Sequence, residues 1–273
     1  ISHSGFIKRF PVSGYRRQSR GGKGVTGAAS REDDFVEHMF IASTHNYILF
    51  FTDQGQCYWL KVFEIPEGGR TAKGKSIVNL ISKDLSENIT AFLSVKDFNE
   101  KNFVLMVTEQ GLVKKTSLAE FSNPRKNGIA AISLKKRDLL QDVKLTDGTS
   151  DIIIGTHEGL SIRFHEDEVR EMGRTAAGVR AIRLEKGDKV IGAVTLKRTT
   201  TTILVATENG YGKRSEVTEY RVSHRGGKGI YTVKATDKTG KMIAIKEVLE
   251  TDDIVVVTSQ GMVIRQDATE IRV

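Results

Sequence analysis

The sequence has little of what would tie it to a membrane, an oxidising compartment or a metal. Its one cysteine, Cys57, cannot form an internal disulfide or supply a metal cluster, which fits a reducing cytosol. No apolar run approaches the roughly 20 residues that a membrane span needs, and no signal-peptide pattern is present. Only three prolines accompany 26 glycines, a balance that favours tight turns and short strands over helices. We therefore expect a cytoplasmic β protein with no membrane partner.

Basic residues moderately outnumber acidic ones. Lysine and arginine number 42 against 34 aspartates and glutamates, which gives a formal charge of +8 and a pI near 9.4. This surplus favours a polyanionic partner without establishing one.

An internal repeat organises the whole chain. Each copy has a short β-type run, a turn that ends in glycine and a second β-type run that usually carries basic residues. The turn glycines lie 48 to 56 residues apart, at Gly5, Gly55, Gly111, Gly159, Gly210 and Gly261. A loop of the form Arg-x-x-(x)-Gly follows 17 to 19 residues later and ends at Gly24, Gly74, Gly128, Gly178 and Gly229. A sixth loop would fall near position 280, so we expect residues 1–273 to be one domain cut from a longer chain.

The repeat predicts an all-β ring. Runs of β-branched residues at 152–154 and 254–257 are typical of buried inner strands. Only residues 30–39 and 164–172 have a helical pattern. About 50 residues per copy, with four strand-like runs each, suit a propeller-like ring of six four-stranded antiparallel blades. Such a ring removes exposed sheet edges, whereas a solenoid is the alternative architecture.

Basic residues are unevenly shared among the repeats. Residues 5–24 hold six cations and no acid, whereas residues 159–178 hold three cations and four acids. On a curved rigid body such cations can neutralise phosphates along an arc, and nothing in the sequence resembles a recognition helix for reading bases. The candidate DNA-binding cations are Lys8, Arg9, Arg16, Arg17, Arg20, Lys23, Arg70, Lys73, Lys114, Lys115, Arg125, Lys126, Lys213, Arg214, Arg225 and Lys228.

The sharpest motif is Gln18-Ser-Arg-Gly-Gly-Lys-Gly24. Its glycines Gly21, Gly22 and Gly24 let backbone amides approach a phosphate closely, while Arg20 and Lys23 supply charge. Residues 223–229 are a near copy. The motif resembles the seven-residue box, Gln-Arg-Arg-Gly-Gly-Lys-Gly, that marks the C-terminal domain of gyrase A subunits. This chain departs from the box at Ser19, which removes one cation.

Other segments extend the resemblance over essentially the whole chain. They are residues 32–35, 77–80, 178–184 and 209–214. The resemblance implies a six-bladed β-pinwheel whose blades exchange strands, and a monomeric, non-catalytic domain without a cofactor. It also implies that the domain wraps duplex DNA with positive handedness, so that gyrase introduces negative supercoils. The implied partners are duplex DNA, the gyrase B subunit, plus the rest of the gyrase A subunit. ATP and Mg²⁺ are used elsewhere in the enzyme, and the location is nucleoid-associated. The corresponding domain of topoisomerase IV is the nearest alternative.

Two further readings compete with DNA wrapping. Residues 69–76 fit the phosphate-loop pattern G-x-x-x-x-G-K-S, but a strand-like run at 77–81 follows where a long helix is needed. Lys73 and Lys75 are therefore interpreted as DNA-facing charge. A protein-interaction propeller would instead show aromatic anchors on one face, whereas the single Trp59 lies in a strand-like run. The six histidines lack metal-ligand spacing, and no catalytic residues are predicted.

Overall fold

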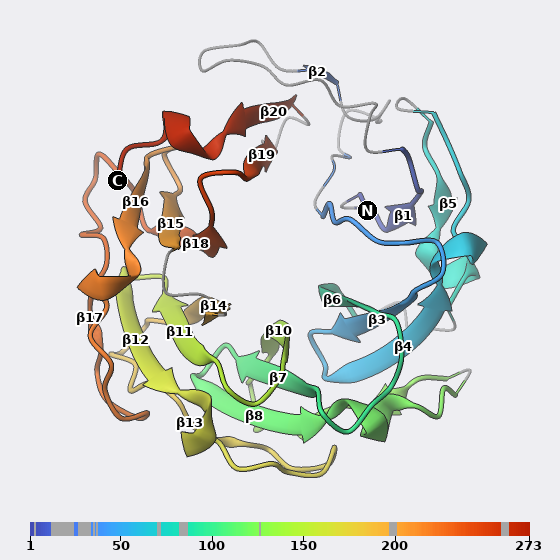
Figure 1. Ribbon diagram of the computed structural model, residues 1–273, viewed down its shortest axis with the longest axis horizontal. Coiled ribbons are helices and arrows are strands. Elements are labelled where there is room, and N and C mark those ends of the chain that lie inside the picture. Colours follow the sequence, from blue (N-terminus) through green and yellow to red (C-terminus); the bar gives the residue numbers. More distant parts are fainter. Residues whose placement is uncertain are drawn as a thin grey trace.

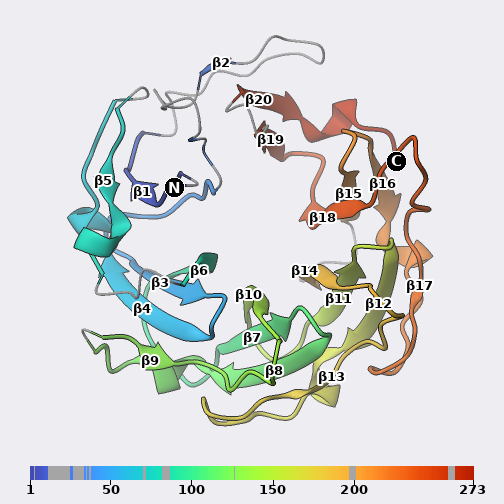
Figure 2. The ribbon, with the colours of Figure 1, turned by 180° about the vertical axis from the view of Figure 1, so that it is seen from behind.

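The structure is a ring of small antiparallel sheets. This computed structural model describes residues 1–2, 4–11, 25–26, 34, 36, 38–69, 72–81, 87–125, 127–196, 201–257 and 262–273, with the backbone alone at 25–26, 257 and 262–263. Figure 1 shows the sheets arranged one after another around a common centre, with the blue strand β2 and the red strand β20 near each other at the top. Figure 2 shows the same ring from behind. The described residues form strands and 3₁₀ turns but no α-helix, so the predicted all-β class is confirmed.

The sheets follow one another around the ring as blades 1 to 6. Blade 1 pairs β1 (Phe6–Ile7) with β5 (Lys75–Ser76). Blade 2 has the order β6 (Ile89–Val95), β3 (Tyr47–Thr52), β4 (Gln56–Lys61), β9 (Ile129–Ala130). Blade 3 has β10 (Leu140–Thr146), β7 (Phe103–Thr108), β8 (Leu112–Ser117), β13 (Val179–Arg180), and blade 4 has β14 (Val190–Leu196), β11 (Asp151–Thr156), β12 (Leu160–His165), β17 (Ile230–Tyr231). Blade 5 contains β18 (Met242–Val248), β15 (Thr202–Thr207) and β16 (Gly212–Glu216), and blade 6 contains β19 (Asp253–Val257), β20 (Met262–Asp267) and β2 (Val25–Thr26).

Neighbouring blades exchange strands. The outermost strand of blades 1 to 4 is a two-residue strand supplied by the next repeat, which we call the donor strand: β5, β9, β13 and β17. The donor strand β2 comes from the first repeat and pairs with β20 of the last blade, Val25 opposite Val263 and Thr26 opposite Met262. The first repeat therefore closes the ring onto the sixth, and the exchange implied by the family resemblance is present.

The exchange explains several of the described turn and loop glycines, and blade 3 shows how. The turn glycines 5, 55, 111, 159 and 210 all have positive φ, which glycine adopts without a Cβ clash. A Cβ on Gly111 would lie 3.0 Å from the carbonyl oxygen of Ile182, just beyond the donor strand. In return, a Cβ on the loop glycine Gly178 would lie 2.6 Å from the carbonyl oxygen of Val113 on the acceptor strand. Both glycines are thus required because two backbones approach closely.

The hydrophobic core lies between blades. One cluster joins Leu49 and Phe51 of β3 to Val104 and Met106 of β7, with Phe121 beside them. Three further clusters fill the spaces between blades 1 and 2, 3 and 4, and 4 and 5. Burial of these apolar faces contributes about 25 cal/mol per Å² and makes each blade depend on its neighbours.

A 3₁₀ turn follows the outer strand of most repeats. These turns are η2 (Val62–Glu64), η4 (Leu118–Phe121), η5 (Glu166–Glu168), η6 (Val217–Glu219) and η7 (Ala268–Glu270), while η3 (Ile77–Asn79) follows donor strand β5.

Two local predictions, at 164–172 and 254–257, are wrong, and a third, at 30–39, can be tested only in part. The expected helix at 164–172 is instead the end of β12, the single turn η5 and an extended segment, because the backbone from Val169 runs along the neighbouring blade. The expected helix at 30–39 lies mostly outside the described residues, and its Val36 forms a β-bridge with Ser2. The run at 152–154 is fully buried as predicted, but Val255 and Val256 are exposed, since no described strand covers the inner side of β19.

Candidate nucleic-acid interface

The predicted cations separate into those that the scaffold uses and those that reach the surface. The motif residues Arg16, Arg17, Gln18, Arg20, Gly21, Gly22, Lys23 and Gly24 lie outside the described residues, as do Arg70 and Lys126. The remaining ten predicted cations can be placed.

The fourth residue after each turn glycine links two blades. The linking side chain donates a hydrogen bond to a backbone carbonyl in or just after the 3₁₀ turn of the next repeat. The pairs are Arg9 Nε to Ile65 O at 2.9 Å, Trp59 Nε1 to Phe121 O at 2.8 Å, Lys115 Nζ to Glu166 O at 3.1 Å, Arg163 Nη1 to Val217 O at 3.0 Å and Arg214 Nε to Ile271 O at 2.9 Å. Five repeats thus use one position for one task, because carbonyls of the short turn can accept a hydrogen bond from outside the turn. The carbonyls of Glu166 and Val217 also accept one locally, from Val169 N and Tyr220 N. We call these five side chains the inter-blade links.

The preceding position has a related task in two blades. Lys8 Nζ donates to the carbonyls of Gly69 and Ala72, at 3.1 and 2.8 Å. Lys114 Nζ donates to the carbonyls of Ala131 and Arg174, the first at 2.6 Å. Burial lowers the pKa of Lys8, and burial, followed by repulsion from the Arg174 guanidinium, lowers the pKa of Lys114 to about 7.

Three predicted DNA contacts are therefore wrong. Lys114, Lys115 and Arg214 are 0%, 7% and 4% exposed and cannot reach a phosphate in this structure. The physical reason is that donor strand β13 and the extended segment near Glu171 cover the strand that holds Lys114 and Lys115. Residues 271–272 bond to Arg214 and cover it in the same way. Lys8 and Arg9 are half-buried and already bonded to carbonyls, so they are poor candidates as well.

The near copy of the box shows how one loop divides its cations. Arg225 donates through Nε to Glu168 O and through Nη1 to Arg180 O, at 2.9 and 3.0 Å, so it ties the loop to the preceding repeat. Lys228 is instead 65% exposed at its side chain, with Nζ 2.9 Å from Glu185. This contact lowers the pKa of the Glu185 carboxyl. The arginine positions the loop, and the lysine presents its charge to solvent.

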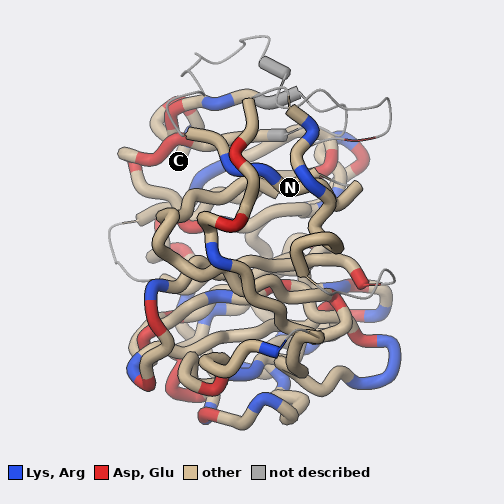
Figure 3. Tube along the Cα trace, turned by 90° about the vertical axis from the view of Figure 1, so that its right-hand side faces the viewer, with Lys and Arg blue, Asp and Glu red and all other residues tan. Residues whose placement is uncertain are grey.

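Four of the predicted cations remain at the surface: Lys73, Arg125, Lys213 and Lys228. Lys73 Nζ also lies 4.0 Å from the centre of the Phe6 ring. Sequence reasoning missed other exposed cations, among them Lys135, Lys136, Arg137, Arg170, Arg180 and Arg221. Arg180 could have been found, because it occupies the second residue of donor strand β13 on the outside of blade 3. Figure 3 views the ring edge-on and shows basic segments, interspersed with acidic ones, along both of its faces.

The phosphate-loop pattern does not form a phosphate loop. Lys75 and Ser76 are the donor strand β5, and the three-residue turn η3 follows where a long helix would be needed. The carbonyls of Gly69 and Ala72 point at Lys8 instead of leaving the loop free to bind a nucleotide. A nucleotide site is therefore discarded.

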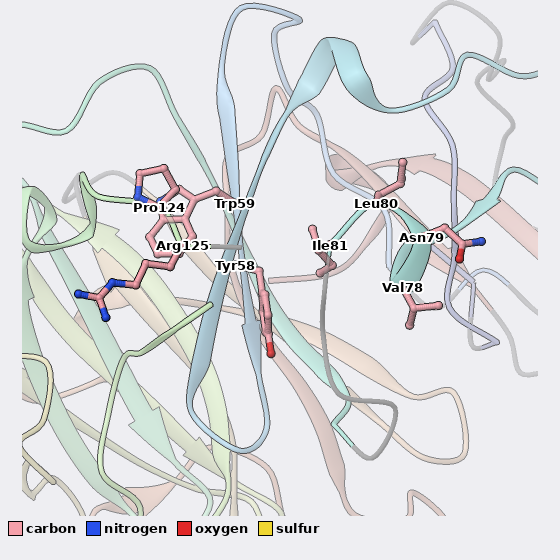
Figure 4. Close-up of a pocket in the computed structure, with 8 residues that line it drawn as sticks. All are labelled: Tyr58, Trp59, Val78, Asn79, Leu80, Ile81, Pro124 and Arg125. Carbon is pink, nitrogen blue, oxygen red and sulfur yellow. The ribbon is translucent and has the colours of Figure 1, made fainter. Parts of the chain in front are cut away.

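A shallow pocket of about 320 Å³ lies on the outside of blade 2. Figure 4 shows its lining: Tyr58, Trp59, Val78, Asn79, Leu80, Ile81, Pro124 and Arg125. It forms where Tyr58 and Trp59 occupy the positions that Lys114 and Lys115 occupy in blade 3. The loop that ends at Gly128 is also two residues shorter than the corresponding loops of the other repeats. Arg125 is the one charged side chain in this lining, so the pocket adds a single cation to the rim.

No metal-binding cluster of histidine, cysteine, aspartate or glutamate occurs within the part of the chain that the structure describes. In the same part, no helix has the length and hydrophobicity for a membrane span.

Comparisons with known proteins agree over the full length. A family model described as the DNA gyrase C-terminal domain, beta-propeller, matches residues 1–43, 46–95, 102–147, 150–197, 201–248 and 252–273. The DNA gyrase A subunit of Staphylococcus epidermidis (strain ATCC 12228) is 46% identical over 273 residues, and that of Staphylococcus aureus (strain MRSA252) is 45% identical. Each match covers 99% of this chain but 31% of the relative, so the chain spans about a third of those relatives' length.

Solved structures give the same picture. The chain is similar to a DNA gyrase A C-terminal domain with a TM-score of 0.87 and 25% identity, covering 100% of this chain and 89% of that one. It is similar to the C-terminal domain of a DNA topoisomerase IV with a TM-score of 0.78 and 27% identity, covering 100% and 83%. The resemblance inferred from the motif and the repeats is confirmed.

Proposed function

This chain belongs to the DNA gyrase C-terminal domain family, and on that premise we propose that it is a non-catalytic module that binds duplex DNA around the rim of the ring. The family match over all six repeats carries the proposal. The exposed rim cations support it, because successive blades each present one at or beside the donor strand: Lys73, Arg125, Arg180 and Lys228.

Cations placed in this way favour contact with the backbone of a curved duplex. Each neutralised phosphate contributes a slope of about −0.9 to the salt dependence of the binding constant, so four contacts give roughly −3 to −4. Bending 20–30 bp by 40–90° costs on the order of 1–6 kcal/mol, which several such contacts can offset. The donor strands and loops carry these cations, and no recognition helix is available among the described elements to read bases.

The finer part of the proposal comes from the family resemblance. The domain wraps DNA with positive handedness, which lets the complete gyrase introduce negative supercoils. It works in the cytoplasm, attached to the rest of the gyrase A subunit, together with the gyrase B subunit, and needs no cofactor of its own. The seven residues Gln18 to Gly24 are proposed as the principal contact.

A topological assay tests this function. The purified chain is bound to nicked circular DNA, the nick is sealed, the protein is removed and the linking number is read. We expect a positive shift that is reduced in Lys228→Ala and in Lys23→Ala. The matched control is Lys101→Ala, a change of an exposed lysine between β6 and β7 that leaves the rim charge intact.

The other readings predict different results. Salt-sensitive binding with no linking-number shift would leave only a basic module that bends DNA at most. No binding at low salt would overturn the proposal in favour of a protein-interaction propeller.

A further inference from the structure

The glycine-ended loop of the fourth repeat, residues 173–178, lacks a lysine that other copies carry. The residue just before the loop glycine is a lysine in three repeats, at Lys23, Lys73 and Lys228. In the fourth repeat this residue is Ala177. The loop's own cation, Arg174, donates through Nη1 to the carbonyl of Ala130 at 3.3 Å. This loop therefore offers no lysine to a DNA backbone.

The fifth repeat shows what lies beside the loop lysine when it is present. Its loop packs against the segment that follows donor strand β13, because Arg183 N donates to Gly227 O at 2.8 Å. Lys228 Nζ then lies 2.9 Å from Glu185 of the turn at 185–188. The turn that follows a donor strand is thus within reach of the next repeat's loop.

The fourth repeat makes the same contact with a turn of opposite charge. Ser133 N donates to Ala176 O at 3.2 Å, and the Ser133 hydroxyl donates to Thr175 O at 2.6 Å. By this correspondence Lys135 occupies, beside the loop of the fourth repeat, the position that Glu185 occupies beside the loop of the fifth. The loop has lost its lysine where the adjoining turn has gained one.

The turn carries three consecutive cations without counter-charge. Lys135, Lys136 and Arg137 are all exposed. Within the part of the chain that the structure describes, no acidic side chain lies within ion-pair distance of these three, whereas Lys189 of the next turn lies 3.2 Å from Glu109. Such a local surplus attracts a polyanion.

The backbone of this turn is held firmly. The Asp138 carboxylate accepts hydrogen bonds from Gln110 N and Leu139 N, both at 2.9 Å. Gln110 Nε2 donates to the carbonyl of Arg137 at 2.7 Å, and Asp138 N donates to Lys135 O at 3.0 Å. A turn fixed in this way loses little backbone freedom when a ligand binds to it.

The conformation of Arg137 is a second sign of function. Its φ is +65°, and it is the one residue other than glycine with positive φ among those the structure describes. The corresponding residue of the next turn is Gly187, the type that this conformation favours. Residues held in an unfavourable backbone conformation are enriched at functional sites. The third turn thus carries an arginine where glycine would be less strained.

The surroundings of the turn favour phosphate over a protein partner. Protein interfaces depend on buried aromatic or aliphatic anchors. None of the large hydrophobic residues that are exposed in the described chain falls within 133–139, and Leu134 and Leu139 are half-buried. Lysine, arginine and side-chain amides are the groups that contact DNA phosphates.

We propose that Lys135, Lys136 and Arg137 form a binding site for the phosphates of duplex DNA, which takes the place of the lysine missing from the loop of the fourth repeat. The inference rests on the proposed function, because it assigns a further contact to the same DNA. The backbone of the duplex would remain in contact with the ring where the chain passes from blade 2 to blade 3.

The salt dependence of DNA binding tests this site. A fluorescent duplex of about 30 bp is titrated with the chain at several salt concentrations and followed by anisotropy. The Lys135→Ala/Lys136→Ala variant should bind roughly fivefold or more weakly at low salt, and its log–log salt slope should be smaller by about 1–2. The matched control is Lys96→Ala/Lys101→Ala, which removes the same charge between β6 and β7 and should leave the slope unchanged.

Two further variants separate charge from structure. Adding Ala177→Lys to Lys135→Ala/Lys136→Ala returns a lysine to the loop and should restore part of the lost slope. Arg137→Gly should weaken DNA binding and raise the melting temperature, because glycine adopts positive φ without a Cβ clash. A merely structural arginine would give no loss of DNA binding when it is replaced in this way.

The inference and the proposed function fail separately. If the native chain binds DNA with salt dependence, an unchanged slope in Lys135→Ala/Lys136→Ala, or an equal loss in the control, overturns the inference alone. Absence of DNA binding by the native chain overturns both. Binding of poly-glutamate that only Lys135→Ala/Lys136→Ala loses, with DNA binding intact, would assign the turn to an acidic protein segment instead.

Discussion

The contact between blades 3 and 4 offers a quantitative test of how this ring is held together. Position 166 holds a hydrophobic side chain in other repeats, where its counterparts are Val62, Leu118, Val217 and Ala268. In the fourth repeat it is a fully buried glutamate. Glu166 Oε1 lies 3.7 Å from Lys115 Nζ, and Thr146 Oγ1 donates to the other carboxylate oxygen. The same ammonium lies 5.3 Å from the centre of the Phe103 ring.

Breaking this pair should be more harmful than replacing it. Lys115→Met leaves the buried carboxylate with the Thr146 hydroxyl as its donor, and Glu166→Leu leaves the ammonium with the backbone carbonyl of residue 166 but without a counter-charge. Each single change should cost about 3–5 kcal/mol, because an uncompensated charge then remains buried. For a chain of this size the melting temperature should fall by roughly 6–20 °C. The double variant should return to within about 1 kcal/mol of the native chain, since leucine suits the site in other repeats.

Urea unfolding of the four proteins measures the coupling directly. The expected coupling free energy is several kcal/mol, far above the values of up to about 1 kcal/mol that exposed ion pairs give. Two results would refute the view that a buried charge pair replaces an apolar contact here. One is a loss of less than about 1 kcal/mol of unfolding free energy in each single variant. The other is a loss in the double variant equal to the sum of the two single losses.

Three further outcomes follow from single sites. Burial lowers the pKa of Lys114 to about 7 from 10.5, so the folded state binds fewer protons than the unfolded one between these values. The unfolding free energy should therefore rise with pH across that window by up to ~1.4 kcal/mol per pH unit, a slope that denaturation of Lys114→Met should lack. Trp59→Phe removes the hydrogen bond to Phe121 O and should cost about 0.5–1.5 kcal/mol in urea unfolding, with no change in DNA affinity. Gly178→Ala should lower the melting temperature clearly more than Gly187→Ala, because both have positive φ but only the first meets a backbone carbonyl.

The architecture could be predicted from the sequence because glycines recur at corresponding positions of every repeat. Turn and loop glycines recur at similar spacing, and several of those described, such as Gly111 and Gly178, mark a close backbone approach at a strand exchange. The repeat alone therefore predicts a ring of blades. The helical pattern at 164–172 was misleading because one turn of acidic residues, Glu166 to Glu168, caps a strand, and periodicity over so short a segment cannot separate these cases.

The roles of individual cations could not be read in the same way. A strand that follows a turn in a repeat of this kind is normally half-exposed, so Lys114 and Lys115 looked like surface charge. Exchange covers their strand with a donor from the next repeat, about 65 residues away in sequence. Whether a basic residue faces solvent is thus decided by a segment that local pattern does not include.

This division of roles changes how the charge surplus bears on DNA binding. In the described loop 223–229, Arg225 is bonded to two carbonyls of the preceding repeat while Lys228 is free to face solvent apart from one exposed glutamate contact. Removing Arg225 would therefore disturb the loop as well as its charge, and loss of DNA binding could follow from either cause. Removing Lys228 changes charge alone. A test of electrostatic wrapping is for this reason cleaner at Lys228 than at Arg225, and net charge summed over a repeat overstates the number of cations available to phosphates.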